Sequence, residues 1–105
     1  MHTNIDGFIC AVTNPAFPNM VWLEQAIRFD EFMEEVQRWS PYRDYVPEHV
    51  RYVSNRMKAK ADLQDAFADA RIADGDWFAI SVAQAVQMID HIADKYPGQE
   101  SGVVR

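Results

Sequence analysis

The fold of this chain is decided by its opening run, Gly7-Phe8-Ile9-Cys10-Ala11-Val12-Thr13-Asn14-Pro15-Ala16-Phe17-Pro18-Asn19-Met20-Val21-Trp22-Leu23. Two short apolar stretches in this run flank a turn that is rich in Pro and Asn. Strand-forming residues on both sides of such a loop predict a hairpin with a wide connection. We therefore expect two antiparallel strands, Phe8 to Thr13 and Met20 to Gln25, on which the rest of the chain packs.

The composition describes one acidic domain. A chain of 105 residues, of which 49% are apolar, has the size and the core material of a single domain. Ten Lys and Arg against sixteen Asp and Glu give a net charge of −6, which disfavours nucleic acid as a direct partner and favours proteins. The single cysteine excludes an internal disulfide. Because no apolar run is long enough to span a membrane, we expect a cytoplasmic protein.

After the hairpin, helix and strand patterns alternate. Arg28 to Trp39 has apolar residues at spacings of three and four, which predicts an amphipathic helix that Ser40-Pro41 ends. His49 to Ser54 alternates in polarity and predicts a third strand. Arg56 to Arg71 predicts a second helix, capped by Asn55 or Ser54.

The last third predicts a turn and a final helix. Gly75 is the expected positive-φ residue of the turn after the second helix. Trp77 to Ile80 is a short extended piece, and the Ser81-Val82-Ala83-Gln84 pattern is a capping box that starts a helix running to about Tyr96. The chain is thus expected to be an α+β domain with a three-stranded antiparallel sheet flanked by helices, over residues 7–96. Residues 1–6 are expected to be a mobile lead-in and residues 97–105 a tail.

The opening run also carries a family resemblance. Gly7, the Asn14-Pro15 turn and Pro18 resemble the first hairpin of the GIY-YIG nuclease superfamily, in its small stand-alone branch from phages and bacteria. Phe67-Ala68-Asp69-Ala70-Arg71 and Asp76-Trp77-Phe78-Ala79-Ile80-Ser81 resemble that branch's Phe-x-x-x-Arg and Glu-Phe-Phe-x-Val-Ser motifs. The resemblance implies the same order of strands and helices as the patterns above.

The catalytic groups that the resemblance implies are absent from this sequence. GIY-YIG enzymes are understood to cut phosphodiesters with a tyrosine pair, an arginine and a glutamate that holds one divalent metal ion. The first-strand Tyr falls on Cys10, the second-motif Tyr or Lys on Trp22 and its Gly on Glu24, while the Arg falls near Met33 and the Glu near Lys60. We therefore expect a GIY-YIG-like fold with no catalytic residue, no metal site and no cofactor.

The alternative is that neighbouring residues take over these catalytic roles. Arg28 or Arg38 would stand in for the arginine, and Asp62 for the glutamate, in an atypical metal-dependent nuclease. Asp62, however, is two positions from Lys60, which is roughly 200° around a helix, so it faces elsewhere.

Two kinds of surface remain as candidate partner-binding sites. One is a pair of acidic helix faces, formed by Asp30, Glu31, Glu34 and Glu35 and by Asp62, Asp65 and Asp69. The other is the aromatic loop that carries Trp39, Tyr42 and Tyr45. Acidic faces of this kind also occur simply as solvated surface, and loop aromatics also cap a core, so both alternatives stay open.

Three functions follow from these patterns. The first is a non-catalytic protein-binding domain, such as a phage or mobile-element inhibitor of the anti-CRISPR kind, which docks its acidic surface in the basic groove of a nucleic-acid-handling complex in the host cytoplasm. The second is the atypical nuclease. The third is a structural or assembly subunit that oligomerises through the aromatic loop and the acidic helices.

Overall fold

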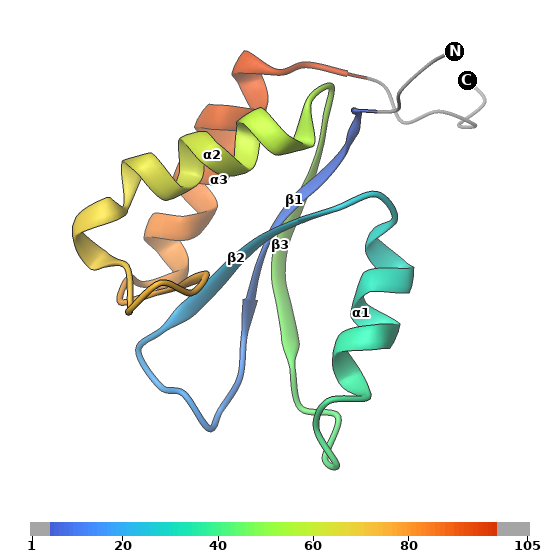
Figure 1. Cartoon of the computed structure of the whole chain (residues 1–105), viewed down its shortest axis with the longest axis vertical. Coiled ribbons are helices and arrows are strands. Elements are labelled where there is room, and N and C mark those ends of the chain that lie inside the picture. Colours follow the sequence, from blue (N-terminus) through green and yellow to red (C-terminus); the bar gives the residue numbers. More distant parts are fainter. Residues whose placement is uncertain (1–4, 99–105) are drawn as a thin grey trace.

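Strand β1 (Gly7–Thr13) is the central element of the computed structural model, which describes residues 5–98. It pairs antiparallel with β2 on one side and with β3 on the other (Figure 1). The short strand β4 pairs with β2 and gives the sheet the order β3-β1-β2-β4. The other elements are β2 (Val21–Ala26), α1 (Phe29–Gln37), β3 (Val46–Val53), α2 (Arg56–Ala66), a 3-10 turn (Ala68–Ala70), β4 (Trp77–Phe78) and α3 (Val82–Lys95).

The prediction of a three-stranded sheet was wrong, because the sheet has four strands. The extended piece after Gly75 pairs with β2, with Val21 opposite Phe78 and Trp22 opposite Trp77. Two residues are too few to show an alternating pattern in the sequence, so only the pairing partner reveals the strand. The α+β class, the antiparallel pairing and the order of the helices agree with the prediction.

Several element ends differ from their predicted positions. β3 begins at Val46 and includes Pro47, which an edge strand tolerates because its outer backbone groups need no partner in the sheet. The second helix ends at Ala66 and continues only as the 3-10 turn. Ala73, with φ of 53°, takes the left-handed conformation that was expected at Gly75. Both reciprocal hydrogen bonds of the capping box, between Ser81 and Gln84, are present.

The expected mobile segments lie mostly outside the described residues. Of the lead-in, only Ile5 and Asp6 are described. The backbone N–H of Arg56 donates to the Ile5 carbonyl over 2.8 Å, and the Tyr52 hydroxyl donates to the Asp6 carboxylate. These bonds fasten the start of β1 to β3 and to the start of α2.

The sheet separates two apolar cores because alternate residues of β1 point to opposite faces. Ile9 and Ala11 point into a core that α2 and α3 cover, and this core includes Leu63 and Phe78. Cys10 and Val12 point into a smaller core under α1. Figure 1 shows α2 and α3 together on one side of the strands and α1 on the other. No helix within residues 5–98 is long and apolar enough to cross a membrane.

Candidate functional site

The most distinctive feature on the α1 side of the sheet is a line of four aromatic rings, which we call the aromatic row: Phe17, Trp77, Trp22 and Trp39. The ring centroids of Phe17 and Trp77 are 5.2 Å apart, and those of Trp77 and Trp22 are 5.9 Å apart with an interplanar angle of 23°. Trp22 then stacks on Trp39 at 5.8 Å and 28°. The row therefore contains all three tryptophans of the chain.

Four different segments position these rings. Trp22 projects from β2 toward α1, and the β2–β4 pairing places Trp77 directly beside it on the same face. Trp39 follows α1, where its backbone N–H donates to the Val36 carbonyl over 3.0 Å. Phe17 lies in the hairpin loop, where its N–H donates to the carbonyl of the buried Asn14 over 2.9 Å. The row is thus a product of the tertiary fold.

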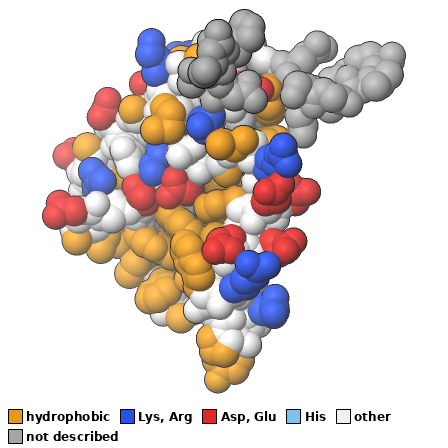
Figure 2. All heavy atoms as spheres, turned by 45° about the vertical axis from the view of Figure 1, so that its right-hand side comes forward, with side chains coloured by type: hydrophobic (Ala, Val, Ile, Leu, Met, Phe, Trp, Pro, Cys, Tyr) orange, Lys and Arg blue, Asp and Glu red, His pale blue; other side chains and the backbone are white. Residues whose placement is uncertain are grey.

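The row is buried at its centre and exposed at its ends. Trp22 is 8% exposed, whereas Trp39 is 60% exposed and Phe17 is also exposed. Figure 2 shows a continuous hydrophobic area on this face of the molecule, bordered by charged side chains. Contiguous apolar surface of this kind, rimmed by polar groups, is typical of interaction sites.

The predicted aromatic loop has both of the roles considered for it, because one of its aromatic side chains caps the core and the others are exposed. Tyr45 is half-buried, packs its edge on Trp22 with ring centroids 6.0 Å apart, and is tied to Gln37 through both of its backbone polar groups. Tyr45 therefore caps the core. Tyr42 is 83% exposed at the tip of the loop, and Trp39 extends the aromatic row outward. Trp39 and Tyr42 are thus the two loop aromatics that a partner can reach.

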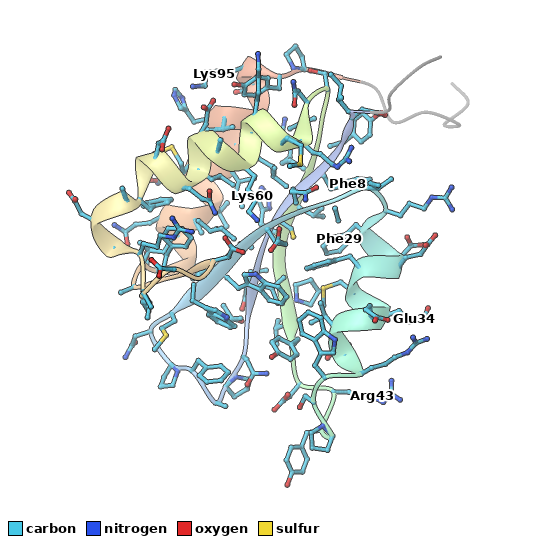
Figure 3. The ribbon with its side chains drawn as sticks, in the orientation of Figure 1. Phe8, Phe29, Glu34, Arg43, Lys60 and Lys95 are labelled. Carbon is cyan, nitrogen blue, oxygen red and sulfur yellow. The ribbon has the colours of Figure 1, made fainter. Side chains whose placement is uncertain are left out.

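A half-buried polar cluster of Glu24, Lys60 and Asp76 borders the row. Lys60 Nζ lies 2.8 Å from Glu24 Oε2 and 3.4 Å from Asp76 Oδ2, and the Lys60 and Glu24 side chains are only 19% and 15% exposed. The indole N–H of Trp22 donates to Glu24 Oε1 over 3.3 Å, which links the cluster to the centre of the row. Figure 3 shows Lys60 reaching from α2 toward the strands.

The charge state of Lys60 follows from its partners. Burial would by itself lower the pKa of this ammonium group, but the hydrogen bond and charge of Glu24, together with Asp76, outweigh burial and raise the pKa above its ordinary value. Lys60 therefore stays charged at neutral pH and neutralises one of the two carboxylates beside it.

The tertiary structure brings together all five positions that the family resemblance singles out. Cys10 lies opposite Glu24 in the β1–β2 pairing, Glu24 contacts both Trp22 and Lys60, and Met33 of α1 packs against the core that contains Cys10 and Trp22. Cys10 is fully buried, and burial, followed by the charge of Glu24, raises the pKa of its thiol to about 12. A thiol with this pKa is not a nucleophile at neutral pH.

We predict that Cys10 does not react with an aromatic disulfide reagent in the folded protein at about pH 8 and reacts fully in denaturant, because only the exposed thiolate is nucleophilic. The reaction is followed by the absorbance of the released thiol. Rapid reaction in buffer, at a rate that is unchanged by denaturant, would contradict the burial of this strand residue.

The proposed substitutes for the family's catalytic groups lie apart from this cluster. Arg28 pairs with Glu31 over 3.0 Å, and Arg38 pairs with Glu34 and Glu35 over 3.3 and 3.0 Å, all on the exposed side of α1. Asp62 accepts a 2.7 Å hydrogen bond from the Tyr96 hydroxyl and lies 3.4 Å from Lys95 Nζ. Asp62 thus joins α2 to α3 and faces away from Lys60, as the helical spacing predicts.

Asp62 gives a prediction about acid stability. The Tyr96 hydrogen bond, followed by Lys95, lowers the pKa of Asp62, so this carboxylate stabilises the fold above about pH 4 and the stabilisation is lost as the pH falls through the lowered pKa. We expect Asp62→Asn to unfold at lower urea concentration at pH 7 and to lose less stability between about pH 5 and pH 2 than the wild type. The exposed Asp65→Asn on the same helix is the control for the loss of one carboxylate charge.

The two predicted acidic faces do not form one surface. Asp30, Glu31, Glu34 and Glu35 are exposed on α1, whereas Asp65 and Asp69 are exposed beyond the other face of the sheet, on α2 and the 3-10 turn. Of these two faces, only the one on α1 lies on the side of the molecule that carries the aromatic row. Figure 3 shows Glu34 projecting from α1 away from the strands, whereas Phe29 of the same helix points toward Phe8.

Sequence reasoning did not identify Phe17, Trp22 and Trp77 as parts of a surface, nor Asp76 as a partner of Lys60. The only sequence signal was the number of tryptophans, because their proximity depends on the β2–β4 pairing. Within residues 5–98, no group of three or more His, Cys, Asp or Glu side chains is arranged to hold a metal ion.

The structure defines the class of this protein as an α+β domain with a four-stranded antiparallel sheet between helices. No protein-family model, no curated protein and no solved structure matches the chain.

Proposed function

We propose that this chain is a non-catalytic protein-binding domain that docks on a basic surface of a nucleic-acid-handling complex. The observation that carries this proposal is the exposed aromatic row at the edge of an acidic helix. Trp and Tyr side chains dominate the energetics of protein interfaces, because they bury a large area at a low cost in conformational entropy. Trp39 and Tyr42 supply such anchors.

The charges around the row support a basic partner. Lys60 is shared by two carboxylates, Glu24 and Asp76, and Arg38 is shared by Glu34 and Glu35. Each group of one cation and two carboxylates therefore has one net negative charge. A negative rim attracts a positive protein surface, speeds the encounter and repels the phosphates of nucleic acid.

The same geometry supports the loss of catalysis that the sequence predicts. The ammonium group of Lys60 occupies the space between Glu24 and Asp76, so the carboxylates beside the family positions are already paired with a cation. The order of the elements and the proximity of Cys10, Trp22 and Glu24 support the interpretation of this chain as a degenerate relative of the GIY-YIG nucleases. In this proposal the domain is an inhibitor of the anti-CRISPR kind, encoded by a phage or mobile element, and it occupies a nucleic-acid channel of its target in the host cytoplasm.

Affinity capture from a lysate of the host cell tests the docking. The bait variants are Glu34→Lys with Glu35→Lys on α1 and the matched control Asp65→Lys with Asp69→Lys, which changes the net charge equally on the other side of the sheet. We expect one basic, nucleic-acid-binding partner that the wild type and the control retain and the α1 variant loses. Capture of only further copies of this chain would instead support an assembly subunit and refute the proposal.

A plasmid-nicking assay with Mg²⁺ or Mn²⁺ tests the absence of catalysis. We expect no metal-dependent cutting above the level of a buffer control. Cutting by the wild type that is lost in Arg28→Ala would show an atypical nuclease and would refute the proposal.

A further inference from the structure

We infer that the aromatic row binds arginine side chains of an extended basic segment, with one guanidinium group stacked on Trp39 and others paired with the carboxylates of the rim. This inference rests on the proposed function and names the chemistry of the partner at the same site.

The indole ring that remains available lies at the exposed end of the row. Trp22 is enclosed because Trp39 and Trp77 stack against it and Phe32 and Tyr45 also contact it. Trp39 is 60% exposed, whereas Trp77 is half-buried between Trp22 and Phe17, so the indole ring of Trp39 is the accessible one. The indole face is the strongest cation–π partner among side chains, and a planar guanidinium group stacks flat on it.

Carboxylates that are not fully neutralised by cations lie near the aromatic row. The Glu24–Lys60–Asp76 cluster holds two carboxylates for one ammonium group beside Trp22, and Glu34 and Glu35 share Arg38, which directly precedes Trp39. Such carboxylates can accept hydrogen bonds from the guanidinium groups of the segment.

Asp44 adds a further carboxylate in the loop that follows Trp39, where the exposed Arg43 directly precedes it. Its carboxylate accepts hydrogen bonds from the hydroxyl of Ser40, over 2.7 Å, and from the side-chain amide of Asn14, over 3.1 Å. These two donors are neutral and leave the charge of Asp44 in place. The Ser40 hydrogen bond is also the main cause that lowers the pKa of Asp44, so this group is ionised at neutral pH.

The charge pattern favours arginine over the other groups that bind an aromatic surface. A second copy of this chain would bring the same negative rim against itself, and a nucleic-acid strand would bring phosphates to it. A lysine ammonium group is a compact and strongly hydrated charge, which loses more hydration on a ring than a guanidinium group does. A basic segment rich in arginine therefore matches both the rings and the rim.

The test uses the full chain and three blocked peptides in which glycine alternates with arginine, lysine or citrulline. Citrulline has the shape of arginine without its charge. Binding is measured by quenching of tryptophan fluorescence and by calorimetry at low and at physiological salt. We expect the arginine peptide to bind about fivefold more tightly than the lysine peptide, and the citrulline peptide not to bind.

Variants locate the binding site. We expect Trp39→Ala to weaken arginine-peptide binding about tenfold, and Glu34→Lys with Glu35→Lys to weaken it similarly at low salt. Asp65→Lys with Asp69→Lys carries the same change of net charge on the other side of the sheet and should bind within about twofold of the wild type, because screening weakens charges at that distance. Thermal unfolding of each variant shows whether it is folded.

The outcomes separate this inference from the proposed function. Equal binding of the lysine and arginine peptides, binding of the citrulline peptide, or the absence of binding by all three overturns the inference. An equal loss in the α1 variant and its control also overturns it, because net charge alone would then explain binding. In each of these cases the proposed function still stands if affinity capture yields a basic partner that depends on α1.

Discussion

Trp22→Ala is expected to lower the free energy of unfolding by about 4 kcal/mol, because a large side chain is removed from the centre of a core and leaves a cavity. Trp22 is 8% exposed and contacts Phe32, Trp39, Tyr45 and Trp77. Its loss also removes the ring that joins Trp39 to Trp77. Urea unfolding followed by far-ultraviolet circular dichroism measures the stability.

A more conservative substitution at the same position separates the effect on stability from the effect on the stacking of the tryptophans. Trp22→Phe keeps part of the core but removes the indole that stacks on both neighbouring indoles, so we expect the exciton signal of coupled tryptophans in the circular dichroism spectrum to vanish. Phe78→Leu, in the core on the α2 and α3 side, should lower the stability by about 1 kcal/mol and leave that signal intact. An unchanged stability of Trp22→Ala would refute the packing of α1 on this face.

Lys60→Met is expected to lower the free energy of unfolding by about 2 kcal/mol, which is less than for a fully buried ion pair because the cluster is only half-buried. The loss arises because Glu24, whose side chain is 15% exposed, keeps its charge and loses the cation that lies 2.8 Å away. The double variant Lys60→Met with Glu24→Gln should recover much of the loss, since the unpaired carboxylate is then absent. Equal destabilisation in the single and double variants would contradict this explanation.

The pH dependence gives an independent test of Lys60. Its pKa is raised in the folded protein, so the stabilisation is fully present below the ordinary lysine pKa and is lost as the pH rises through the raised value. We expect the wild type to lose stability above about pH 10 and Lys60→Met to lose less over the same range. Urea unfolding at about pH 9 and pH 11 measures the difference.

A large part of the fold could be predicted from local sequence patterns. The hairpin of β1 and β2 followed from two strand-forming stretches around a Pro and Asn loop, and the start of α3 followed from the capping box at Ser81. The direction of Asp62 away from Lys60 followed from the helical repeat. Each of these inferences needs only residues a few positions apart or one repeating geometry.

The candidate site could not be predicted in the same way. Trp39 and Tyr42 were identified as possible contact residues, but the aromatic row also needs Trp22 and Trp77, whose contact depends on a strand of two residues. Lys60 was expected to do no more than exclude a metal ion, whereas the pairing of β2 with β4 and the packing of α2 place it between Glu24 and Asp76. No local pattern encodes contacts between residues so far apart in the chain.

The sequence by itself determined the acidic character of the domain and the existence and type of its main helices and strands. Only the tertiary structure decided that the three tryptophans stack in one row and that α1 alone places its acidic face on that side. The physical reason is that secondary structure depends on the repeat of neighbouring side chains. A surface depends instead on which faces the sheet brings together, and register and packing fix those only when the whole chain is folded.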